Sequence, residues 1–269
     1  MNSNNNPPVS ILVVVWNECD VLDGCFGSIK NQTFQDYKVV CVNNGSDDKS
    51  FEKIIKWQGL IGKEKFQIIS NKKNIGLTKA LNVALKKANG KYIARLDPDD
   101  LWEKDKLARQ VDFMEKNPEY GIIGCNHINV YKNNNNKKYI NLPETHKLIS
   151  EKLFRRNPFA HSCILAKTDL IKSVDGYDEK IKYGQDYELW LRCFPKTKFY
   201  NLQDFLCLRS VDSGISVKKQ NAQMWQSIKT RLKYIRKYNY NWKNYLYLLE
   251  PLLVVLTPNF IKNLKRKYL

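Results

Sequence analysis

Short apolar runs and amphipathic helical patterns alternate along residues 10–96 of this 269-residue chain. Residues 10–15 read SILVVV, as expected of a strand that is buried on both faces of a parallel sheet. Residues 77–88 place Leu77, Leu81 and Leu85 on one helical face. This alternation predicts an α/β fold with a mostly parallel open sheet and helices on both faces. The strands are expected at 10–15, 37–42, 66–70 and 91–96, and the helices at 21–29, 51–58 and 77–88.

The pattern changes after a further helix, which is expected at 104–116. Strands are then expected at 121–131, 138–142 and 162–166, with one or two short strands within 199–208, and helical segments at 148–154, 168–173 and 186–193. The chain finally reads as a helical extension over 221–238 and 242–269, with breaks at Pro251 and Pro258.

Polar clusters follow two of the expected strands, at 43–48 and at 97–100. Parallel sheets bind ligands beyond the carboxyl ends of their strands, so we expect the two clusters to lie near each other. The second cluster reads Asp97-Pro98-Asp99-Asp100, and three carboxylates in four residues repel one another. A hard cation such as Mg²⁺ or Mn²⁺ would relieve that repulsion and keep positions open for phosphate oxygens. The alternative is that Asp99 or Asp100 caps the following helix.

The charge of the chain is strongly positive, with 45 Lys and Arg against 27 Asp and Glu. Residues 218–269 hold twelve of the basic residues, many aromatic residues and one acid, Glu250. Cationic and interfacial aromatic side chains suit an anionic lipid surface, which predicts a membrane-associating extension. The alternatives are a packing element with a solvated basic face and, ranked last because no RNA-binding motif occurs, a nucleic-acid binder.

The cysteines and the apolar segments indicate the cellular compartment. Seven cysteines at irregular spacing, without a C-x-x-C pair, argue against a disulfide framework or a zinc site and favour a reducing cytosol. No signal-peptide pattern occurs at the start. The longest apolar stretch, 245–256, is interrupted by Glu250 and Pro251 and is too short to cross a bilayer. We therefore expect a cytoplasmic protein, peripheral on the inner face of the cytoplasmic membrane.

A series of motifs in fixed order resembles the family 2 glycosyltransferases, which are nucleotide-sugar enzymes of the GT-A fold. The motifs are VSILVVVWNE (9–18), SIKNQTF (28–34), VNNGSD (42–47), NIGL (74–77), ALN (80–82), GKYIARLDPDD (90–100) and QDYELWLR (185–192). The resemblance covers about residues 9–216. An ordered series is far more specific than any one of its motifs.

The resemblance implies roles for three carboxylates. Asp97 and Asp99 match the D-x-D pair that holds Mn²⁺ or Mg²⁺ on the diphosphate and contacts the ribose. Asp186 matches the general base, which takes the proton of the acceptor hydroxyl as that hydroxyl attacks the anomeric carbon. A single displacement of this kind inverts the anomeric configuration. Without the resemblance, Asp186 would be interpreted as the N-cap of its own helix.

Further residues are implied as contacts of the nucleotide sugar. The nucleoside-pocket residues of the family map to Val14, Trp16, Asn17, Glu18, Asn43 and Asn44, and two donor-side residues map to Asn82 and Arg95. Arg95 serves equally well as a structural partner of the aspartates. His161 resembles a residue on the acceptor side in some members, although a satisfied core histidine is the favoured interpretation.

Several positions depart from the family pattern. Val14 and Trp16 replace a Pro and a Tyr, Asn43-Asn44 replaces Asp-Asp, and Val211 stands where a His often follows the motif arginine, here Arg209. An Asn can accept from a uracil N3–H, but it can also serve a different base. Gln185 replaces a Glu and leaves Asp186 without a neighbouring charge to raise its pKa.

These observations predict an inverting, metal-dependent hexosyltransferase. The expected donor is a UDP-sugar, and the expected acceptor is a saccharide or lipid-linked saccharide of bacterial surface polysaccharide or lipopolysaccharide synthesis. The expected domains are a GT-A domain at 1–217, with a nucleotide-sugar half at 8–103 and an acceptor half at 104–217, and the basic aromatic extension at 218–269. The rivals are a degenerate, membrane-tethered binding module and a nucleotidyltransferase, whose Gly-rich basic signature is absent.

Overall fold

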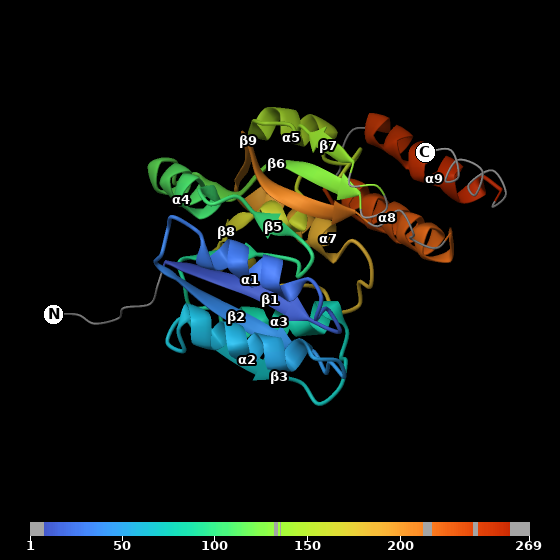
Figure 1. Ribbon diagram of the computed structural model, residues 1–269. Helices are drawn as coiled ribbons and strands as arrows, with labels where there is room; N and C mark the ends of the chain where they lie inside the picture. Colours follow the sequence, from blue (N-terminus) through green and yellow to red (C-terminus); the bar gives the residue numbers. More distant parts are fainter. Residues whose placement is uncertain (1–7, 132–133, 135, 212–216, 239–241, 259–269) are drawn as a thin grey trace.

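A mixed β-sheet extends through the fold, with the strand order β3-β2-β1-β4-β8-β6-β9-β5 and β7 paired to β6 (Figure 1). The computed structural model describes residues 8–131, 134, 136–211, 217–238 and 242–258. Strands β1 to β4 pair in parallel. The elements of this first half are β1 (Val9–Val15), α1 (Leu22–Lys30), β2 (Tyr37–Asn43), α2 (Ser50–Ile61), β3 (Phe66–Ser70), α3 (Leu77–Lys87) and β4 (Tyr92–Arg95).

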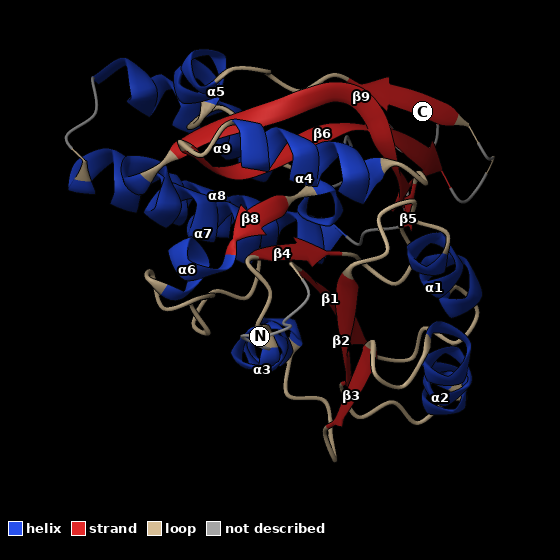
Figure 2. Cartoon of the chain, turned by 90° about the vertical axis from the view of Figure 1, so that its left-hand side faces the viewer, coloured by secondary structure: helices blue, strands red, loops and turns tan. Residues whose placement is uncertain are grey.

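Alternate residues of β1 point to two separate cores, which explains the unbroken apolar run. Ile11 and Val13 pack with residues of α1, α2 and α4, whereas Leu12 and Val14 pack with α3 and with elements of the second half. Figure 2 shows α1 and α2 on one side of β1–β3 and α3 on the other. Because all seven residues of β1 are buried, both faces of the strand lose apolar surface to water, as in a doubly covered sheet.

The second half of the sheet joins the first through β8, which runs antiparallel to both β4 and β6. Beyond β8, β6 and β9 pair in parallel, and β5 and β7 add antiparallel edges. The elements are β5 (Leu101–Trp102), α4 (Lys106–Lys116), β6 (Tyr120–Tyr131), β7 (Lys137–Ile140), α5 (His146–Lys152), η1 (His161–Cys163), β8 (Leu165–Lys167), α6 (Thr168–Lys172), α7 (Gln185–Cys193), η2 (Phe194–Lys196) and β9 (Lys198–Val211).

Two predicted strands of this half differ from the structure. The strand expected at 162–166 is a 3₁₀ turn followed by the short β8. Ser162 forms hydrogen bonds with residues distant in the sequence instead of with a neighbouring strand. Its carbonyl accepts from Trp102 Nε1 at 2.7 Å, and its hydroxyl accepts from the backbone N–H of Asp97 at 3.1 Å. The one or two short strands expected within 199–208 form one strand of 14 residues, β9, which pairs with β6 through register shifts.

The C-terminal extension contains α8 (Val217–Lys237), η3 (Trp242–Leu248) and α9 (Leu249–Leu256). Helix α8 packs on the rest of the fold, since Tyr234 and Ile235 share an apolar cluster with Leu153 and Leu191. The break expected at Pro251 is wrong: this proline lies in the first turn of α9, where a backbone N–H has no helical partner in any case. Over the described residues, no helix combines the length and the apolar character needed to cross a bilayer.

Candidate functional site

The carboxyl ends of β1, β2 and β4 lie side by side, with β1 between the other two. The chain builds β2 and β3 on one side of β1 and then returns to place β4 on the other, so the strand order reverses here, at the position where such sheets bind ligands. Hydrogen bonds join the loops after β1 and β2. The N–H of Glu18 donates to Ser50 Oγ at 2.9 Å, and the N–H of Asp47 donates to Asn17 Oδ1 at 3.0 Å. Both predicted polar clusters therefore reach the same edge.

The residues predicted for the nucleoside pocket occupy this edge in different ways. Val14 is buried beneath it, whereas the Trp16 ring is 52% exposed and is available to a ligand. The amide oxygen of Asn43 accepts from the backbone of its own loop, at Ser46. Asn17 adopts a left-handed backbone with φ 55°, which turns the chain out of β1 toward Glu18.

Asn44 is used by the protein itself. Its side chain is buried, donates to Asn74 Oδ1 at 3.0 Å and accepts from Asn71 Nδ2 and the Ile75 N–H at 3.0 and 3.2 Å. The amide thereby holds the loop after β3 against the end of β2. A contact between Asn44 and a nucleobase stays a prediction, and making it would require the amide to give up one of these bonds.

The Asp97–Asp100 turn connects β4 to β5. Arg95, which is 2% exposed, forms a two-pronged ion pair with Asp97. Asp100 is buried, accepts from the Ser210 N–H at 2.8 Å and lies 3.7 Å from Arg209 Nε. Burial, followed by the neighbouring charge of Asp97, raises the pKa of Asp100 to about 6. The ion pair with Asp97 makes Arg95 a structural partner of the aspartates, one of the two roles that the sequence left open.

Two arginines thus neutralise two of the three carboxylates that the sequence brings together. The third, Asp99, is only partly buried. Among the described residues, no set of three or more His, Cys, Asp or Glu side chains is arranged to hold a metal by itself. The donor set fits Mg²⁺ or Mn²⁺ in the manner these ions prefer, with one or two carboxylates from the protein and the remaining ligands from phosphates and water. Asp99 and Asp97 stay the predicted carboxylates.

A cavity of about 580 Å³ opens above this turn and contains residues from both halves of the fold. Arg95 lines it from β4, Asp97 from the turn after β4, Arg209 from β9, and Asp186 from α7. The Nε atoms of Arg95 and Arg209 are buried and have no hydrogen-bond partner in the structure. Buried donors without partners are costly, so both guanidinium groups are suited to an anionic ligand. Trp16, Asn17, Asn82 and Asp99 lie outside the lining of this cavity.

Asp186 lies in the first turn of α7, with its carboxylate at the cavity wall. Asn157 Nδ2 donates to Asp186 Oδ2 at 2.7 Å. The N-cap of the helix is Gly184, so the interpretation of Asp186 as an N-cap is wrong. Burial raises the pKa of Asp186, and Asn157 opposes that rise by stabilising the charged form. Desolvation therefore provides the upward shift that a neighbouring Glu would have supplied.

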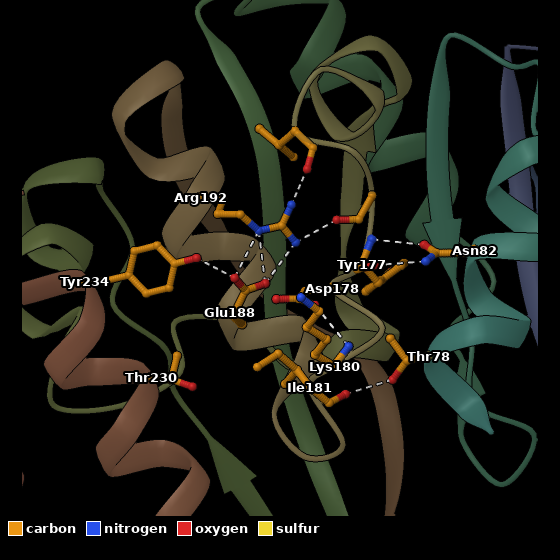
Figure 3. Close-up of polar contacts among 12 residues, drawn as sticks. Thr78, Asn82, Tyr177, Asp178, Lys180, Ile181, Glu188, Arg192, Thr230 and Tyr234 are labelled. Carbon is orange, nitrogen blue, oxygen red and sulfur yellow. Dashed lines mark hydrogen bonds and ion pairs between the residues drawn. The ribbon is translucent and has the colours of Figure 1, made fainter. Parts of the chain in front are cut away.

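Asn82 holds the loop between α6 and α7. It donates to the Tyr177 carbonyl at 2.9 Å and accepts from the Tyr177 N–H at 2.9 Å, as Figure 3 shows. Tyr177 Oη in turn lies 2.8 Å from His161 Nε2, and burial lowers the pKa of His161 well below its usual value. His161 is thus a satisfied, neutral histidine at the cavity wall, as favoured from the sequence. A donor contact by Asn82 stays a prediction.

Four residues at the site were not singled out from the sequence. Asn157 supports Asp186, Ser162 caps the Asp97 turn, Arg209 pairs with Asp100, and Gln223 of α8 lines the cavity. Arg209 carried a signal, since it is the arginine of the last family motif. The others lie in segments of ordinary composition, and only the tertiary fold brings them to the cavity.

Known proteins resemble this chain in sequence. The family model described as glycosyl transferase family 2 matches residues 10–173. An uncharacterized glycosyltransferase of Methanocaldococcus jannaschii is 32% identical over 96% of this chain and 92% of its own length. The amylovoran biosynthesis glycosyltransferase AmsE of Erwinia amylovora is 28% identical over 84% of each chain.

Solved glycosyltransferase structures share the fold. The mannosyltransferase PcManGT of Pyrobaculum calidifontis, in complex with GDP-Man and Mn²⁺, superposes with a TM-score of 0.69 at 17% identity, over 92% of this chain and 74% of its own. TarS residues 1–349 of S. aureus, in complex with UDP, superpose with a TM-score of 0.66 at 20% identity, over 83% of this chain; the match spans 65% of that fragment. The predicted GT-A fold class is confirmed.

Proposed function

This chain belongs to the family 2 glycosyltransferases, and we propose that it transfers a hexose or N-acetylhexosamine from a nucleoside diphosphate donor to a saccharide acceptor. The observation that carries the proposal is the meeting of Asp97, Arg95 and Asp186 in one cavity. Asp97 and Asp186 are 89 positions apart in the sequence, yet both carboxylates line this one cavity. Charge for the diphosphate and a base for the acceptor are thus adjacent.

Asp186 acts as the general base in this proposal. It takes the proton of the acceptor hydroxyl while the hydroxyl oxygen attacks the anomeric carbon. The bond from that carbon to the diphosphate oxygen breaks, and the nucleoside diphosphate leaves. One displacement inverts the anomeric configuration, so an α-linked donor gives a β-glycoside. The raised pKa of Asp186 makes its carboxylate a better proton acceptor than an ordinary aspartate.

The donor end of the cavity would hold the diphosphate. Arg95 and Arg209 offer buried guanidinium donors, and Asp99 with Asp97 would hold Mn²⁺ or Mg²⁺ beside them. A bound divalent cation stabilises charge on a departing diphosphate. UDP is the proposed nucleotide, supported by the complexes of TarS with UDP and UDP-GlcNAc, while PcManGT binds GDP-Man with Mn²⁺. Trp16 at the end of β1 would pack on the base.

The acceptor is proposed to belong to a bacterial surface polysaccharide or lipopolysaccharide, in free or lipid-linked form. The naming of AmsE for amylovoran biosynthesis supports a polysaccharide. We divide the chain into the GT-A domain at 1–217 and the extension at 218–269, and we propose that the extension holds the enzyme on the inner face of the cytoplasmic membrane.

A row of leucines on the extension supports the membrane contact. Leu249, Leu253 and Leu256 recur at i, i+4 and i+7 on α9 and are 52%, 64% and 66% exposed. Trp242 of η3 is 67% exposed. The basic residues Lys262, Lys265, Arg266 and Lys267 follow α9 in the sequence and lie outside the described residues. Apolar side chains that insert among lipid tails, with cations beside them, are the signature of a helix that lies in the plane of an anionic bilayer.

The donor site is tested by thermal shift. We expect Mn²⁺ together with one nucleoside diphosphate among UDP, GDP, dTDP and CDP to raise the melting temperature, because binding to the folded state stabilises it by mass action. At a ligand concentration a hundredfold above Kd the gain is about 2.7 kcal/mol. A shift with UDP alone supports the proposed donor. Folded protein that shifts with none of the four nucleotides would contradict the transferase proposal and favour a degenerate binding module.

The membrane contact is tested with the double variant Leu249→Glu/Leu253→Glu. We expect it to bind vesicles of phosphatidylglycerol and phosphatidylcholine at least tenfold more weakly than the wild type, because each leucine contributes on the order of 1.5–3 kcal/mol when fully buried. Co-sedimentation measures the binding. The control is Leu60→Glu, since Leu60 is a similarly exposed leucine, 46%, on α2. Equal binding of the double variant, or equal binding to vesicles without phosphatidylglycerol, would refute the contact.

A further inference from the structure

A second, smaller cavity continues from the catalytic one and lies between α7 and the extension helix α8. Its volume is about 210 Å³. It shares Asn157, Tyr183, Gly184 and Gln223 with the larger cavity, so the two form one continuous groove. The shared residues surround the start of α7, which carries Asp186. A ligand in the smaller cavity would therefore end at the carboxylate that serves as the base.

One face of α8 builds the outer wall of this groove. Gln223, Ser227, Thr230 and Arg231 are spaced at i, i+4, i+7 and i+8, which places them on one side of the helix. Arg231 fixes that side in position, because its Nη1 donates to the Tyr247 carbonyl at 2.9 Å and its Nη2 to the Arg155 carbonyl at 3.0 Å. One turn later, Tyr234 Oη donates to the buried carboxylate of Glu188 on α7 (Figure 3). The wall is thus joined to the helix that holds the base.

The lining of the smaller cavity is polar and aromatic, with one charged side chain among its described residues, Arg231. It offers amides and hydroxyls, including Asn157, Gln223 and Ser227, and the ring of Tyr187, whose hydroxyl is already bonded to the Leu153 carbonyl at 2.7 Å. Among the described residues, no carboxylate lines it, and the lining cation Arg231 donates from both terminal nitrogens to carbonyls while its buried Nε has no hydrogen-bond partner. The larger cavity contains the cations Arg95, Arg209 and Lys182 together with the carboxylates Asp97 and Asp186. The three cations suit the larger cavity to phosphate, whereas the amides, hydroxyls and Arg231 Nε of the smaller cavity offer hydrogen bonds to an uncharged polar ligand.

We propose that the groove between α7 and α8 is the subsite for the acceptor sugar. The extension, which contributes α8, would then help to select the acceptor. The inference rests on the proposed function. A pyranose has apolar C–H faces that pack on tyrosine rings and a rim of hydroxyls that pair with amides and hydroxyls. Asn157 stands at the junction and donates to Asp186 Oδ2 at 2.7 Å. A sugar hydroxyl that reaches the same junction meets the carboxylate that takes its proton.

The test fills the subsite from α8. Ser227→Trp places a large ring in the groove, and Ala222→Trp places the same ring on an exposed position of the same helix as a matched control. The probes are p-nitrophenyl β-glycosides of glucose, galactose and N-acetylglucosamine, offered with Mn²⁺ and the nucleoside diphosphate that gives the thermal shift. Saturation-transfer NMR reports glycoside binding, and the thermal shift reports the nucleotide site independently.

We expect at least one glycoside to bind the wild type and Ala222→Trp, and to bind Ser227→Trp at least tenfold more weakly, with the same nucleotide shift in all three proteins. Undiminished glycoside binding to Ser227→Trp, or no glycoside binding to the wild type while the nucleotide shift is intact, overturns the subsite. Loss of the nucleotide shift in the wild type overturns the proposed function instead. If Ser227→Trp loses its fold, Gln223→Ala replaces it; we expect that variant to weaken glycoside binding at least threefold, and unchanged binding overturns the proposal.

Discussion

Asp186→Asn is expected to lower the transfer rate by about 10²–10⁴-fold, which is the range that a positioned general base contributes. The substitution keeps the size of the side chain and an oxygen that accepts from Asn157, whose Nδ2 lies 2.7 Å from Asp186 Oδ2. It removes the ability to take a proton. Donor binding should persist, so the thermal shift with Mn²⁺ and nucleotide should equal that of the wild type. Turnover and thermal shift are measured on the same preparation.

The pH dependence of the transfer rate provides a second test of the role of Asp186. Only the ionised carboxylate accepts a proton, so the rate should fall as pH drops through the pKa of Asp186. Because burial raises that pKa above its usual 3.8, the acid limb should lie higher than for an ordinary aspartate. Asp186→Asn should lack this limb. If nucleotide binding is lost together with turnover, Asp186 has a structural role and the assignment is wrong.

The sheet could be predicted from the sequence where its signal is local. Residues 66–70 form β3 as expected, and β1, β2 and α3 differ from their predicted bounds by a residue at an end. These segments are unbroken apolar runs or regular amphipathic helices, so the hydrophobic pattern of neighbouring residues is enough to predict them. Residues 162–166 were misread because the conformation of Ser162 is decided by Trp102 and Asp97, which lie about sixty residues away.

In the candidate site, too, local sequence signals could be interpreted and long-range contacts could not. Asp97 and Asp186 could be predicted as site residues because each belongs to a motif, and the structure brings them to one cavity. The roles of Asn44 and Asn82 could not be read locally, because an amide serves a ligand and a distant backbone equally well. Their partners, Asn71, Asn74 and Tyr177, are known only once the chain is folded. The groove beside α8 likewise could not be predicted from the sequence, since the amide and hydroxyl side chains that line it form no motif.

Asp99→Asn and Asp97→Asn are expected to abolish transfer for different reasons, and their stabilities separate the two. Asp99 is partly buried and belongs to the D-x-D motif, so its substitution should remove the Mn²⁺-dependent part of the nucleotide shift. Because it leaves no buried arginine without its partner, it should lower the melting temperature of the free protein less than Asp97→Asn does. Asp97 pairs with Arg95, which is 2% exposed. Breaking a buried pair from one side leaves an uncompensated charge and costs about 3 kcal/mol.

For a chain of this size, that loss lowers the melting temperature of the free protein by roughly 6–12 °C. Differential scanning fluorimetry without ligand, with Mn²⁺, and with Mn²⁺ and nucleotide measures both effects. Asp112→Asn is the control, because Asp112 is an exposed carboxylate on α4 that pairs only with Lys116 one turn away. Full turnover and an intact Mn²⁺-dependent shift in Asp99→Asn would exclude Asp99 as a metal ligand. An unchanged melting temperature in Asp97→Asn would show that Arg95 finds another partner. The ion pair between Arg95 and Asp97 would then not stabilise the turn.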